Sequence, residues 1–407
     1  MHECIEIRGA KSSEVGKYIS LLDSLETTDS EVAKYKLLVK ARYPYFPPEQ
    51  IRVVISGNEI LSALLVFPEF IQLGEARLRV GVLGRLFTSP LNNKRGVGSR
   101  LIRDSVAYLE KQKFNLALVF DVPRFYQRFG FVPAFFESYR DLKYRKEYLV
   151  SYVPPPFYRV RRIKPADIPI VQKIHDQLDE NTFGSVLRAH FHYSLKWNEY
   201  RNSWVIYDAI GKVHGYFCTG FVWKQIMTIK EIGCIGKDSM IPVVNNILNL
   251  ANRFGCKIIR FLAPPDYVIF NWLEELGIKL SETSVSKSHF GMVKILNLED
   301  TFECLTPEWE KKLHGSVLRN KDVEVTFIID SQPFNIYSRK GNISISNRMG
   351  KNKVSLDKED LALLILGSES GEDWVSNWGF GISDDAKNLI KIMFPKRFPY
   401  IWYLDRL

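Results

Sequence analysis

Two segments in the first third of the chain combine residue types and spacings that suit a chemical reaction. The first covers residues 90–99 and reads Pro-Leu-Asn-Asn-Lys-Arg-Gly-Val-Gly-Ser, between a predicted strand and a predicted helix. Gly96 and Gly98 let backbone N–H groups approach an anion closely, and the helix dipole adds a favourable field. Lys94 and Arg95 stand where they can meet phosphates. Alone, the segment is as typical of a tight turn, and it is also compatible with dinucleotide binding, although the third glycine of that fingerprint is missing.

The second segment reads Arg-Phe-Tyr-Gln-Arg-Phe-Gly-Phe-Val-Pro-Ala at residues 124–134. It follows a short apolar run that predicts a strand buried on both faces. Phe125, Phe129 and Phe131 are expected to close a hydrophobic core. For Tyr126 a chemical role is favoured instead, because it lies just beyond that strand in a region that also carries the glycine-containing loop.

The elements around these segments alternate between strands and helices, which predicts a mixed α/β sheet. A Gly57-Asn58 turn joins two apolar runs into a hairpin, and an amphipathic helix follows the glycine-containing loop. The predicted elements of this region are strands Ile51–Ile55, Glu59–Phe67, Ala76–Phe87 and Leu116–Phe120, and helix Val97–Lys113 with Val97, Leu101, Ile102, Val106 and Leu109 on its apolar face.

The chain also contains two distant segments with a similar residue pattern. Residues 5–15 and 158–168 both read as a short strand that ends in Arg, then Lys, then an acidic-apolar pair that begins a helix. Three consecutive prolines at 154–156 form a stiff linker between the copies. The second copy continues with predicted strands Ser203–Ala209, Val213–Phe221, Ile229–Ile235 and Lys257–Leu262, and with helix Ile241–Phe254. Two tandem domains of one fold account for this pattern.

The pattern changes at about residue 298, where short strands alternate with Gly, Asn and Ser turns. The predicted elements are strands Val323–Asp330, Phe334–Ser338, Asn342–Ile345 and Lys353–Leu356 and helices Lys358–Leu366 and Asp384–Met393. This is expected to be a third, α+β domain. The predicted division of the chain is therefore 1–152, 153–297 and 298–407.

Composition narrows the class of protein. The 407 residues carry a net charge of +10 and are 46% hydrophobic, which fits a folded globular chain. The basic residues are spread over the whole sequence and form no dense stripe, so nucleic-acid binding is not expected. No apolar run is long enough to span a membrane and the start does not resemble a signal peptide. The five cysteines have no metal-ligand spacing, and a cytoplasmic location is expected.

The two chemical segments together resemble those of GCN5-related (GNAT) acetyltransferases. Residues 93–98 are similar to the acetyl-CoA loop of that family, and residues 125–131 to its Phe-Tyr-x-x-x-Gly-Phe motif. Two tandem GNAT-like domains, of which only the first has the loop, followed by a sterol-carrier-like domain, resemble the Eis (enhanced intracellular survival) acetyltransferases. The end of the chain carries further likeness, in the helix Leu361–Gly367, the Phe394-Pro395 step and the acidic-aromatic ending Pro399–Leu407.

This resemblance implies acetyl-CoA as co-substrate, with its pantetheine lying like an added strand between two splayed strands. One side of the gap would offer main-chain groups, the helix start would wrap the pyrophosphate, and residues after the next strand would line the other side. Asn93 stands where the family usually has Arg or Gln. The implied binding residues are Leu86, Phe87, Thr88, Asn93, Lys94, Arg95, Gly96, Val97, Gly98, Ser99, Asp121 and Val122.

The resemblance also implies how a proton is supplied and removed. A phenol with a pKa near 10 suits a thiol leaving group with a pKa of about 8.5, so Tyr126 is the expected general acid. In Eis enzymes the terminal carboxylate acts as base, which here is that of Leu407, although the family commonly ends in an aromatic residue. A frayed terminus is the alternative.

The remaining expectations concern the acceptor, the second domain and assembly. The acceptor is a primary amine of a small molecule or of lysine, for which Asp121 and Glu137 are candidate acids. The second domain reads Gly-Lys-Asp-Ser-Met at 236–240 in place of the loop and is expected to be structural. His190 and His192 alternate along a possible strand, but two imidazoles make a poor metal site and no metal is expected. The resemblance implies a homo-oligomer, commonly a hexamer.

A non-catalytic binder of acyl-CoA or lipid is the alternative function, and a nucleotide-dependent oxidoreductase is third.

Overall fold

The computed structural model describes residues 5–24, 39, 47–89, 96–145, 148, 158–189, 192–195, 200, 202–287 and 291–406. The predicted proline linker at 154–156 lies outside these residues. The described chain forms two compact units. The first contains the residues up to Ala134 and those from Gly291 to Arg397, and the second contains Phe135–Lys287 and Phe398–Arg406.

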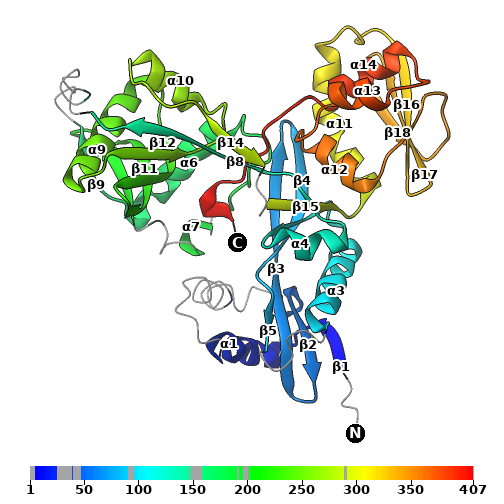
Figure 1. Ribbon diagram of the computed structural model, residues 1–407, viewed down its shortest axis with the longest axis horizontal. Helices are drawn as coiled ribbons and strands as arrows, with labels where there is room; N and C mark the ends of the chain where they lie inside the picture. Colours follow the sequence, from blue (N-terminus) through cyan, green and yellow to red (C-terminus); the bar gives the residue numbers. More distant parts are fainter. Residues whose placement is uncertain are drawn as a thin grey trace. The chain divides into compact units, whose positions relative to one another are not determined.

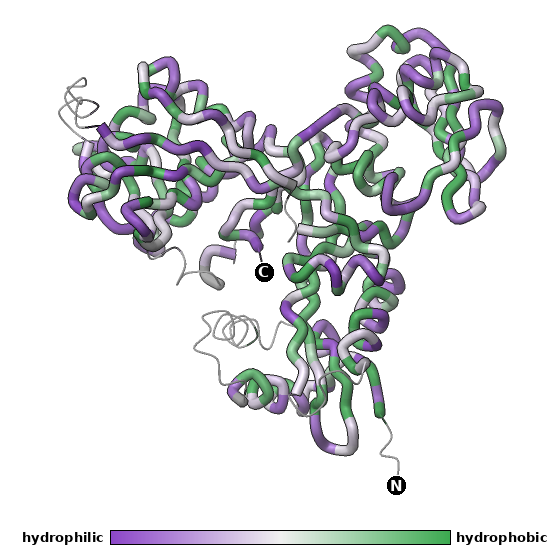
Figure 2. Tube along the Cα trace, viewed as in Figure 1, coloured by the Kyte–Doolittle hydropathy of each residue, from purple (hydrophilic) through white to green (hydrophobic). Residues whose placement is uncertain are grey.

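The first unit is built on a mixed sheet (Figure 1). Neighbouring strands run antiparallel except for the fourth and fifth, which are parallel. Hydrophobic residues run along its central strands, as Figure 2 shows, and these form the core. The order across the sheet is β1 (Ile5–Gly9), β2 (Ile51–Ser56), β3 (Glu59–Leu73), β4 (Ala76–Leu83), β6 (Leu116–Phe120), β15 (Gly291–Ile295) and β7 (Val132–Pro133), and β5 (Phe87–Thr88) pairs with β3.

Between these strands in the chain, the described residues form the helices α1 (Val15–Ser24) and α3 (Val97–Lys111) and the single helical turn α4 (Pro123–Tyr126). Helix α3 has the predicted amphipathic pattern, because residues at helical spacing on one face are buried in the core. A buried arginine on β2, Arg52, pairs with Asp104 of α3 at 2.6 Å and lies over the ring of Tyr108 on the same helix. The helix is therefore fixed against the sheet by packing and by a charged contact.

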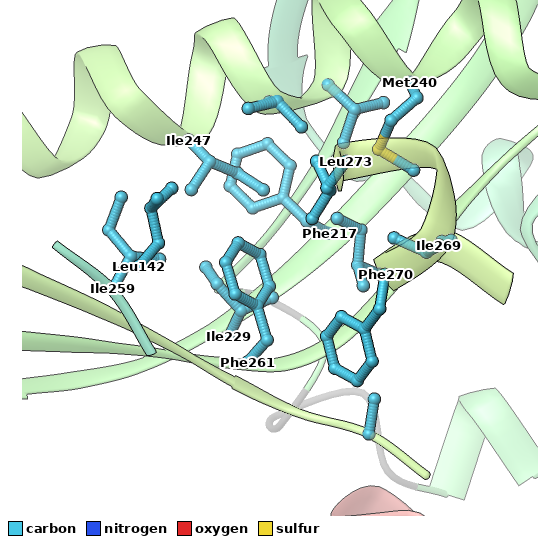
Figure 3. Close-up of a cluster of buried hydrophobic side chains, with 14 of the residues drawn as sticks. Leu142, Phe217, Ile229, Met240, Ile247, Ile259, Phe261, Ile269, Phe270 and Leu273 are labelled. Carbon is cyan, nitrogen blue, oxygen red and sulfur yellow. The ribbon is translucent and has the colours of Figure 1, made fainter. Parts of the chain in front are cut away.

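The second unit repeats this sheet. Its order is β9 (Arg159–Arg162), β10 (Ser203–Tyr207), β11 (Val213–Trp223), β12 (Ile226–Cys234), β13 (Ile258–Leu262), β8 (Phe136–Lys143) and β14 (Ser284–Lys287). Again the fourth and fifth strands, β12 and β13, are parallel. The helices are α6 (Ile168–Asp179), α7 (His192–Leu195), α9 (Met240–Arg253) and α10 (Val268–Glu275). Side chains of α9 and α10 interdigitate with those of the sheet in one core (Figure 3).

The sixth strand of each sheet comes from the other copy. Strand β8 follows the first copy in sequence but pairs with β13 and β14 of the second unit. Strand β15 ends the second copy in sequence but pairs with β6 and β7 of the first unit. The order of the strands in the sequence therefore does not decide which sheet these two strands join, because a local apolar pattern marks a strand without specifying its partner.

The two similar sequence segments also make the same contacts. Arg8 donates to both carboxylate oxygens of Glu14, at 2.8 and 2.9 Å, and Arg161 does the same to Asp167, at 2.6 and 2.8 Å. In each copy the same carboxylate also accepts the backbone N–H of a lysine three residues earlier, at 2.7 Å. The carboxylate thus ties the first strand to the start of the first helix. With the shared strand order, this confirms the predicted mixed α/β class.

The segment from residue 298 to 397 adds an α+β layer to the first unit. Its sheet has the order β18 (Asn342–Ser346), β17 (Gln332–Arg339), β16 (Asp322–Ile329) and β19 (Lys353–Ser355), with helices α11 (Leu298–His314), α12 (Lys358–Ile365), α13 (Gly371–Trp378) and α14 (Asp384–Met393). Helix α11 packs beside β4, where its buried Glu308 accepts the N–H of Glu75 at 2.9 Å. None of the helices in the described part of the chain combines the length and apolar composition needed to cross a bilayer.

Candidate acetyl-transfer site

The parallel pair of the first sheet ends where the predicted site begins. Strands β4 and β6 are in register from Val80 and Leu116 to Leu83 and Val119. Beyond Leu83 the chain stops following β6, and β5 pairs instead with Ser62 and Ala63 of β3. Within the described residues no pairing joins β5 to β6. The two parallel strands therefore part at their carboxyl ends, as the prediction of splayed strands requires.

A buried serine on β3 fixes the position of β5. Ser62 donates its hydroxyl to the carbonyl of Phe87 at 2.9 Å and lies 2.9 Å from the hydroxyl of Thr88. Phe87 is buried, whereas Leu86 and Thr88 are half-buried. Sequence reasoning named these last three residues but missed Ser62, because nothing in the local pattern marks a serine as the partner of a strand 25 residues later.

Two glycines at the start of α3 have different structural roles. Gly96 caps the helix in the left-handed conformation, at φ 73°, which glycine adopts without strain. A Cβ at Gly98 would lie 2.7 Å from Cδ2 of Leu86, so a side chain there would require the end of Leu86 to shift. Val97, Gly98 and Ser99 begin the helix, and no side chain of the described residues caps it. Their N–H groups are those that an α-helix leaves without an internal partner. Asn93, Lys94 and Arg95 lie outside the described residues.

Tyr126 ends a single helical turn, α4 (Pro123–Tyr126), that follows β6 directly. Its side chain is 0% exposed, and its hydroxyl donates to Oδ2 of Asp121 at 3.3 Å. This bond is longer than the usual 2.7–2.8 Å of an O–H···O contact, so it is a weak one. The other oxygen of Asp121 accepts the N–H of Val122 at 2.7 Å, which holds the carboxylate at the end of the strand. The structure thus brings together Tyr126, Asp121 and Val122, and Val122 is exposed.

The aromatic residues around Tyr126 form the predicted core. The rings of Phe125 and Phe131 meet that of Tyr126 edge to face, with centroids 5.0 and 5.9 Å away. Phe131 is buried, and Phe129 packs on Phe125 with centroids 5.5 Å apart. Edge-to-face pairs of this kind hold a ring in a defined orientation. The phenol therefore has little freedom to turn away from the end of β6.

The corresponding region of the second unit is arranged differently. In place of the glycine-containing loop, a 3-10 turn at Lys237–Ser239 leads into α9, and Lys237 pairs with Glu275. A tyrosine, Tyr267, again follows the fifth strand, but its hydroxyl donates to the carbonyl of Ile232 on β12 at 2.7 Å. This bond bridges the place where β12 and β13 separate.

The candidate residues near the second unit have mixed outcomes. The possible strand around His192 is wrong, because His192–Leu195 is a short helix; His190 lies outside the described residues. Tyr193, the next residue in the chain, is 0% exposed and accepts a hydrogen bond from Arg188. Glu137 accepts a hydrogen bond from Arg406 at 2.9 Å. Leu407, the candidate base, lies outside the described residues.

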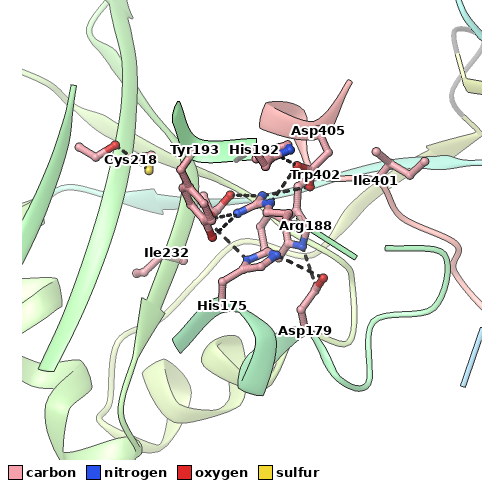
Figure 4. A network of polar contacts seen from close by, with 12 residues as sticks. His175, Asp179, Arg188, His192, Tyr193, Cys218, Ile232, Ile401, Trp402 and Asp405 are labelled. Atoms are coloured by element: carbon pink, nitrogen blue, oxygen red, sulfur yellow. Dashed lines mark hydrogen bonds and ion pairs between the residues drawn. The ribbon is translucent and has the colours of Figure 1, made fainter. Parts of the chain in front are cut away.

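A buried polar cluster in the second unit was missed by sequence reasoning. Arg188 contacts Glu231 and Asp405, and His175, Asp179 and His192 surround them (Figure 4). Asp405 is separated from Arg188 by 217 residues, so no spacing could have revealed the pair. Among the described residues, no group of three His, Cys, Asp or Glu side chains is placed to hold a metal ion.

Comparison with known proteins gives the family of the first copy. Residues 6–134 match the family model of the acetyltransferase (GNAT) domain. No curated protein matches the sequence. Helices and strands of the whole chain are nevertheless shared with solved structures.

Three of these structures show the fold over almost the full length of both chains. A probable N-acyltransferase from Enterococcus faecalis V583 is 14% identical over 98% of this chain and 99% of that one, with a TM-score of 0.74. A GCN5-related N-acetyltransferase from Anabaena variabilis is 13% identical over 99% and 100%, with a TM-score of 0.71. Eis1 from Mycobacterium abscessus is 11% identical over 98% and 99%, with a TM-score of 0.62. The match of residues 6–134 to the GNAT acetyltransferase domain supports the predicted enzyme class, an acetyltransferase.

Proposed function

We propose that the protein is an acetyl-CoA-dependent N-acetyltransferase of the Eis type, which transfers acetyl to a primary amine of a small molecule or of lysine. GNAT enzymes use acetyl-CoA as co-substrate and amines as acceptors. The observation that carries the proposal is the position of Tyr126, whose hydroxyl lies beside Asp121 at the point where β4 and β6 part. The likeness of the full-length fold to Eis1 supports the Eis type.

The residues at the end of the parallel pair fit a CoA thioester. Because Gly98 has no side chain, the first turn of α3 lies close to Leu86, and backbone N–H groups there would approach a ligand without an intervening side chain. Main-chain groups of Leu86, Phe87 and Thr88 would bond to the pantetheine, with Asp121 and Val122 on the other side. Lys94, Arg95 and Asn93, with Gly96 to Ser99, would surround the pyrophosphate.

The chemistry then needs one proton delivered and one removed. The acceptor's neutral amine attacks the thioester carbonyl carbon, an N–C bond forms, and the C–S bond breaks. Tyr126 gives its phenolic proton to the departing sulfur, which leaves as the thiol. A base takes the extra proton of the amine, and the phenol regains a proton from solvent.

The carboxylate of Leu407 is the proposed base. Arg406, the residue before it, is anchored by hydrogen bonds to Glu137 and to the carbonyl of Ile401.

The proposal extends to the setting of the reaction. Asp121 and Glu137 are proposed to attract a cationic acceptor. The α+β segment 298–407 is proposed to be a sterol-carrier-like domain, and the protein to act in the cytoplasm as a homo-oligomer, with a hexamer as the form that the resemblance implies. Division into domains 1–152, 153–297 and 298–407 remains part of this proposal.

A turnover screen tests the proposal. Acetyl-CoA is mixed with polyamines, aminoglycosides and lysine peptides in turn, and release of the free thiol is followed with a thiol reagent while mass spectrometry looks for the acetylated amine. We expect thiol release that depends on one acceptor class. Binding of acetyl-CoA without thiol release for any acceptor would contradict the enzyme and favour the acyl-CoA binder. Failure to bind any acyl-CoA would point to the oxidoreductase.

A further inference from the structure

One corner of the second unit exposes two large aromatic side chains beside a hairpin turn. Strands β11 and β12 are joined by the two-residue turn Lys224-Gln225, which directly follows Trp223. Trp223 is 66% exposed, and Phe254, the residue after the end of α9, is 57% exposed. The carbonyl of Gln225 accepts the N–H of Lys257 at 2.8 Å, which holds the chain after α9 against the turn. The two aromatic residues therefore belong to neighbouring segments of one surface.

The hairpin turn itself is made of residues that strain the backbone. Lys224 and Gln225 both have left-handed backbone conformations, with φ at 46° and 63°. Two-residue turns of this kind usually contain Asn-Gly, because other side chains at positive φ cost free energy. A strained position that a folded chain retains is a pointer to function. Here the turn places a lysine at the tip, with its Nζ 4.3 Å from the centroid of the Trp223 ring.

Four exposed cations accompany the two aromatic residues. They come from three distant parts of the sequence, so only the fold gathers them, through the pairing of β8 with β13 and a bond from the Tyr144 N–H to the carbonyl of Lys257 at 2.9 Å. None of the four forms an ion pair with another described residue. The cationic corner is made up of Trp223 and Phe254 with Lys143, Lys224, Arg253 and Lys257.

The charged residues next to the cationic corner do not offset its charge. Asp141, two residues before Lys143 in the chain, is already paired with Arg260 at 2.8 Å. On the segment that leads into β14, Lys279 and Glu282 contribute one charge of each sign. The corner therefore keeps a positive potential.

The corresponding corner of the first copy has different residues and a partner within its own unit. Its third and fourth strands, β3 and β4, are joined by the turn Gly74-Glu75, in which a glycine takes the left-handed position at φ 64°. Helix α11 packs beside this turn, because Glu308 accepts the N–H of Glu75 at 2.9 Å and Lys311 pairs with the Glu75 carboxylate. A glycine and an acid thus stand where the hairpin is covered by a helix, and a tryptophan and a lysine stand where it is exposed.

The side chains of the cationic corner suit an anionic lipid surface. Tryptophan rings settle at the boundary between water and hydrocarbon, and lysine and arginine are attracted to anionic headgroups. A protein partner fits less well, because lysine supplies three of the four cations and is depleted at protein–protein interfaces. Single-stranded nucleic acid also fits less well, because a base stacks on an open ring face and Lys224 lies over the Trp223 ring.

We propose that the cationic corner docks the protein on membranes that contain anionic lipid. Trp223 and Phe254 enter the headgroup region, and the four cations meet the lipid phosphates and carboxylates. The chain associates with the surface of the bilayer in this way without crossing it. The inference does not depend on the proposed function, since it concerns a separate surface of the second unit.

Sedimentation of the full chain with lipid vesicles tests the docking site. We expect binding to vesicles of equal parts phosphatidylserine and phosphatidylcholine, and much weaker binding to phosphatidylcholine alone or at high salt. Trp223→Ala should weaken binding about tenfold, because less apolar surface enters the headgroup region. Trp378→Ala is the matched control, since it removes a tryptophan that is 69% exposed on α13 of the first unit, and it should leave binding unchanged. No binding by the parent chain, or equal binding by the two variants, would overturn the proposal.

A second matched pair tests whether the place of the charge matters. Lys257→Gln should weaken binding to the anionic vesicles about fivefold, as the loss of one cation near a lipid surface does. Lys212→Gln removes an exposed lysine just before the start of β11, at the opposite end of that strand from Trp223, and should have little effect. Equal losses in the two variants would show that net charge alone drives binding, and would overturn the docking site.

Two further measurements distinguish other occupants of the cationic corner. Binding of a single-stranded oligonucleotide that Trp223→Ala abolishes, without vesicle binding, would overturn the proposal in favour of nucleic acid. A change of oligomeric state in Trp223→Ala, again without vesicle binding, would overturn it in favour of a contact between copies of the chain. Slower amide hydrogen exchange at residues 222–226 and 253–258 when the anionic vesicles are added would support the proposal.

Discussion

The two copies of the fold have the same seven-strand order and the same arginine–carboxylate tie at their start, but their parallel pairs end differently. In the first, Tyr126 follows β6 and bonds to Asp121 on its own side of the gap, and two glycines shape the turn into α3. In the second, Tyr267 follows β13 and bonds across the gap to β12, and the helix start is a 3-10 turn.

The difference shows which parts of the fold are needed for the sheet and which for a ligand. The shared features are the parallel pair of strands and the arginine–carboxylate contact that joins the first strand to the first helix. They occur where both copies need a stable core. Differing features cluster at the carboxyl ends of the parallel strands, which is where open α/β sheets bind ligands. A few residues at that edge thus decide whether the tyrosine bonds on its own side of the gap or bridges the gap.

The largest effect should come from the two tyrosines. Tyr126→Phe is expected to lower kcat by about 10²- to 10⁴-fold with acetyl-CoA affinity nearly unchanged, because it removes the proton donor and leaves the ring in place. Tyr267→Phe is expected to leave kcat unchanged and to lower the free energy of unfolding by about 1–3 kcal/mol, because the buried carbonyl of Ile232 loses its donor. Steady-state kinetics and urea unfolding measure the two.

The pair serves as its own control, since each variant removes one buried hydroxyl. Equal kcat in Tyr126→Phe and the parent protein would end the assignment of the acid. A loss of turnover in Tyr267→Phe as large as that in Tyr126→Phe would show that both act only through stability.

Acid should destabilise the second copy before the first, through His175. Burial lowers the pKa of this imidazole to about 4, and the charge of Arg188 acts in the same direction. In the unfolded chain His175 binds a proton near pH 6.5, whereas in the folded chain it stays neutral until about pH 4. The free energy of unfolding is therefore at its maximum above about pH 6.5 and falls by about 3 kcal/mol as the pH drops to 4. His175→Gln should remove this part of the slope in urea unfolding between pH 7 and pH 4.5. A slope unchanged in that variant would contradict the role of His175.

Much of the local structure could be predicted because it depends on neighbouring residues. The amphipathic spacing of α3, the Gly57-Asn58 turn and the apolar run of β6 each specify an element by themselves. Helix α11 was not predicted, because Pro307 in its interior normally ends a helix.

What could not be predicted depends on partners distant in sequence. Strands β8 and β15 each join the sheet of the other copy. Which sheet edge a strand reaches decides this, whereas the sequence indicates only that each segment is a strand. Ser62 bonds to Phe87, and Arg188 bonds to Asp405. These residue types are common, and their structural role is visible only from the contacts they make in the folded chain. The site residues found from sequence were those of a motif, whereas the residues that hold them in place were not.

The shared first-strand tie should behave alike in both copies. Arg8 and the Lys11 N–H, against the effect of burial, lower the pKa of Glu14 to about 2, and Arg161 and the Lys164 N–H, again against burial, lower that of Asp167. The stability that each ion pair contributes is present above the ordinary carboxyl pKa and is lost as the pH falls below it. Glu14→Gln and Asp167→Asn should each lower the free energy of unfolding by about 2 kcal/mol at pH 7, and the effect should shrink toward pH 3. Unequal losses would show that the two copies do not rely on this contact equally.

The smallest effects should separate Gly98, in the first turn of α3, from Gly236, which precedes the 3-10 turn before α9. At Gly98 a methyl group would press on the end of the Leu86 side chain, 2.7 Å away, so Gly98→Ala should shift Leu86 and weaken acetyl-CoA binding by up to about tenfold. The same change improves helix propensity by up to about 1 kcal/mol, so stability should not fall.

At Gly236 nothing lies within 4 Å of an added Cβ, but φ is 71°, so Gly236→Ala should cost about 1 kcal/mol of stability through backbone strain alone. Isothermal titration with acetyl-CoA and thermal unfolding of both variants make the comparison. Opposite outcomes in the two assays are expected, affinity lost at Gly98 and stability lost at Gly236, because only the first helix start is shaped for a ligand. Equal acetyl-CoA affinity in Gly98→Ala and the parent protein would show that the close approach of α3 to Leu86 serves packing alone.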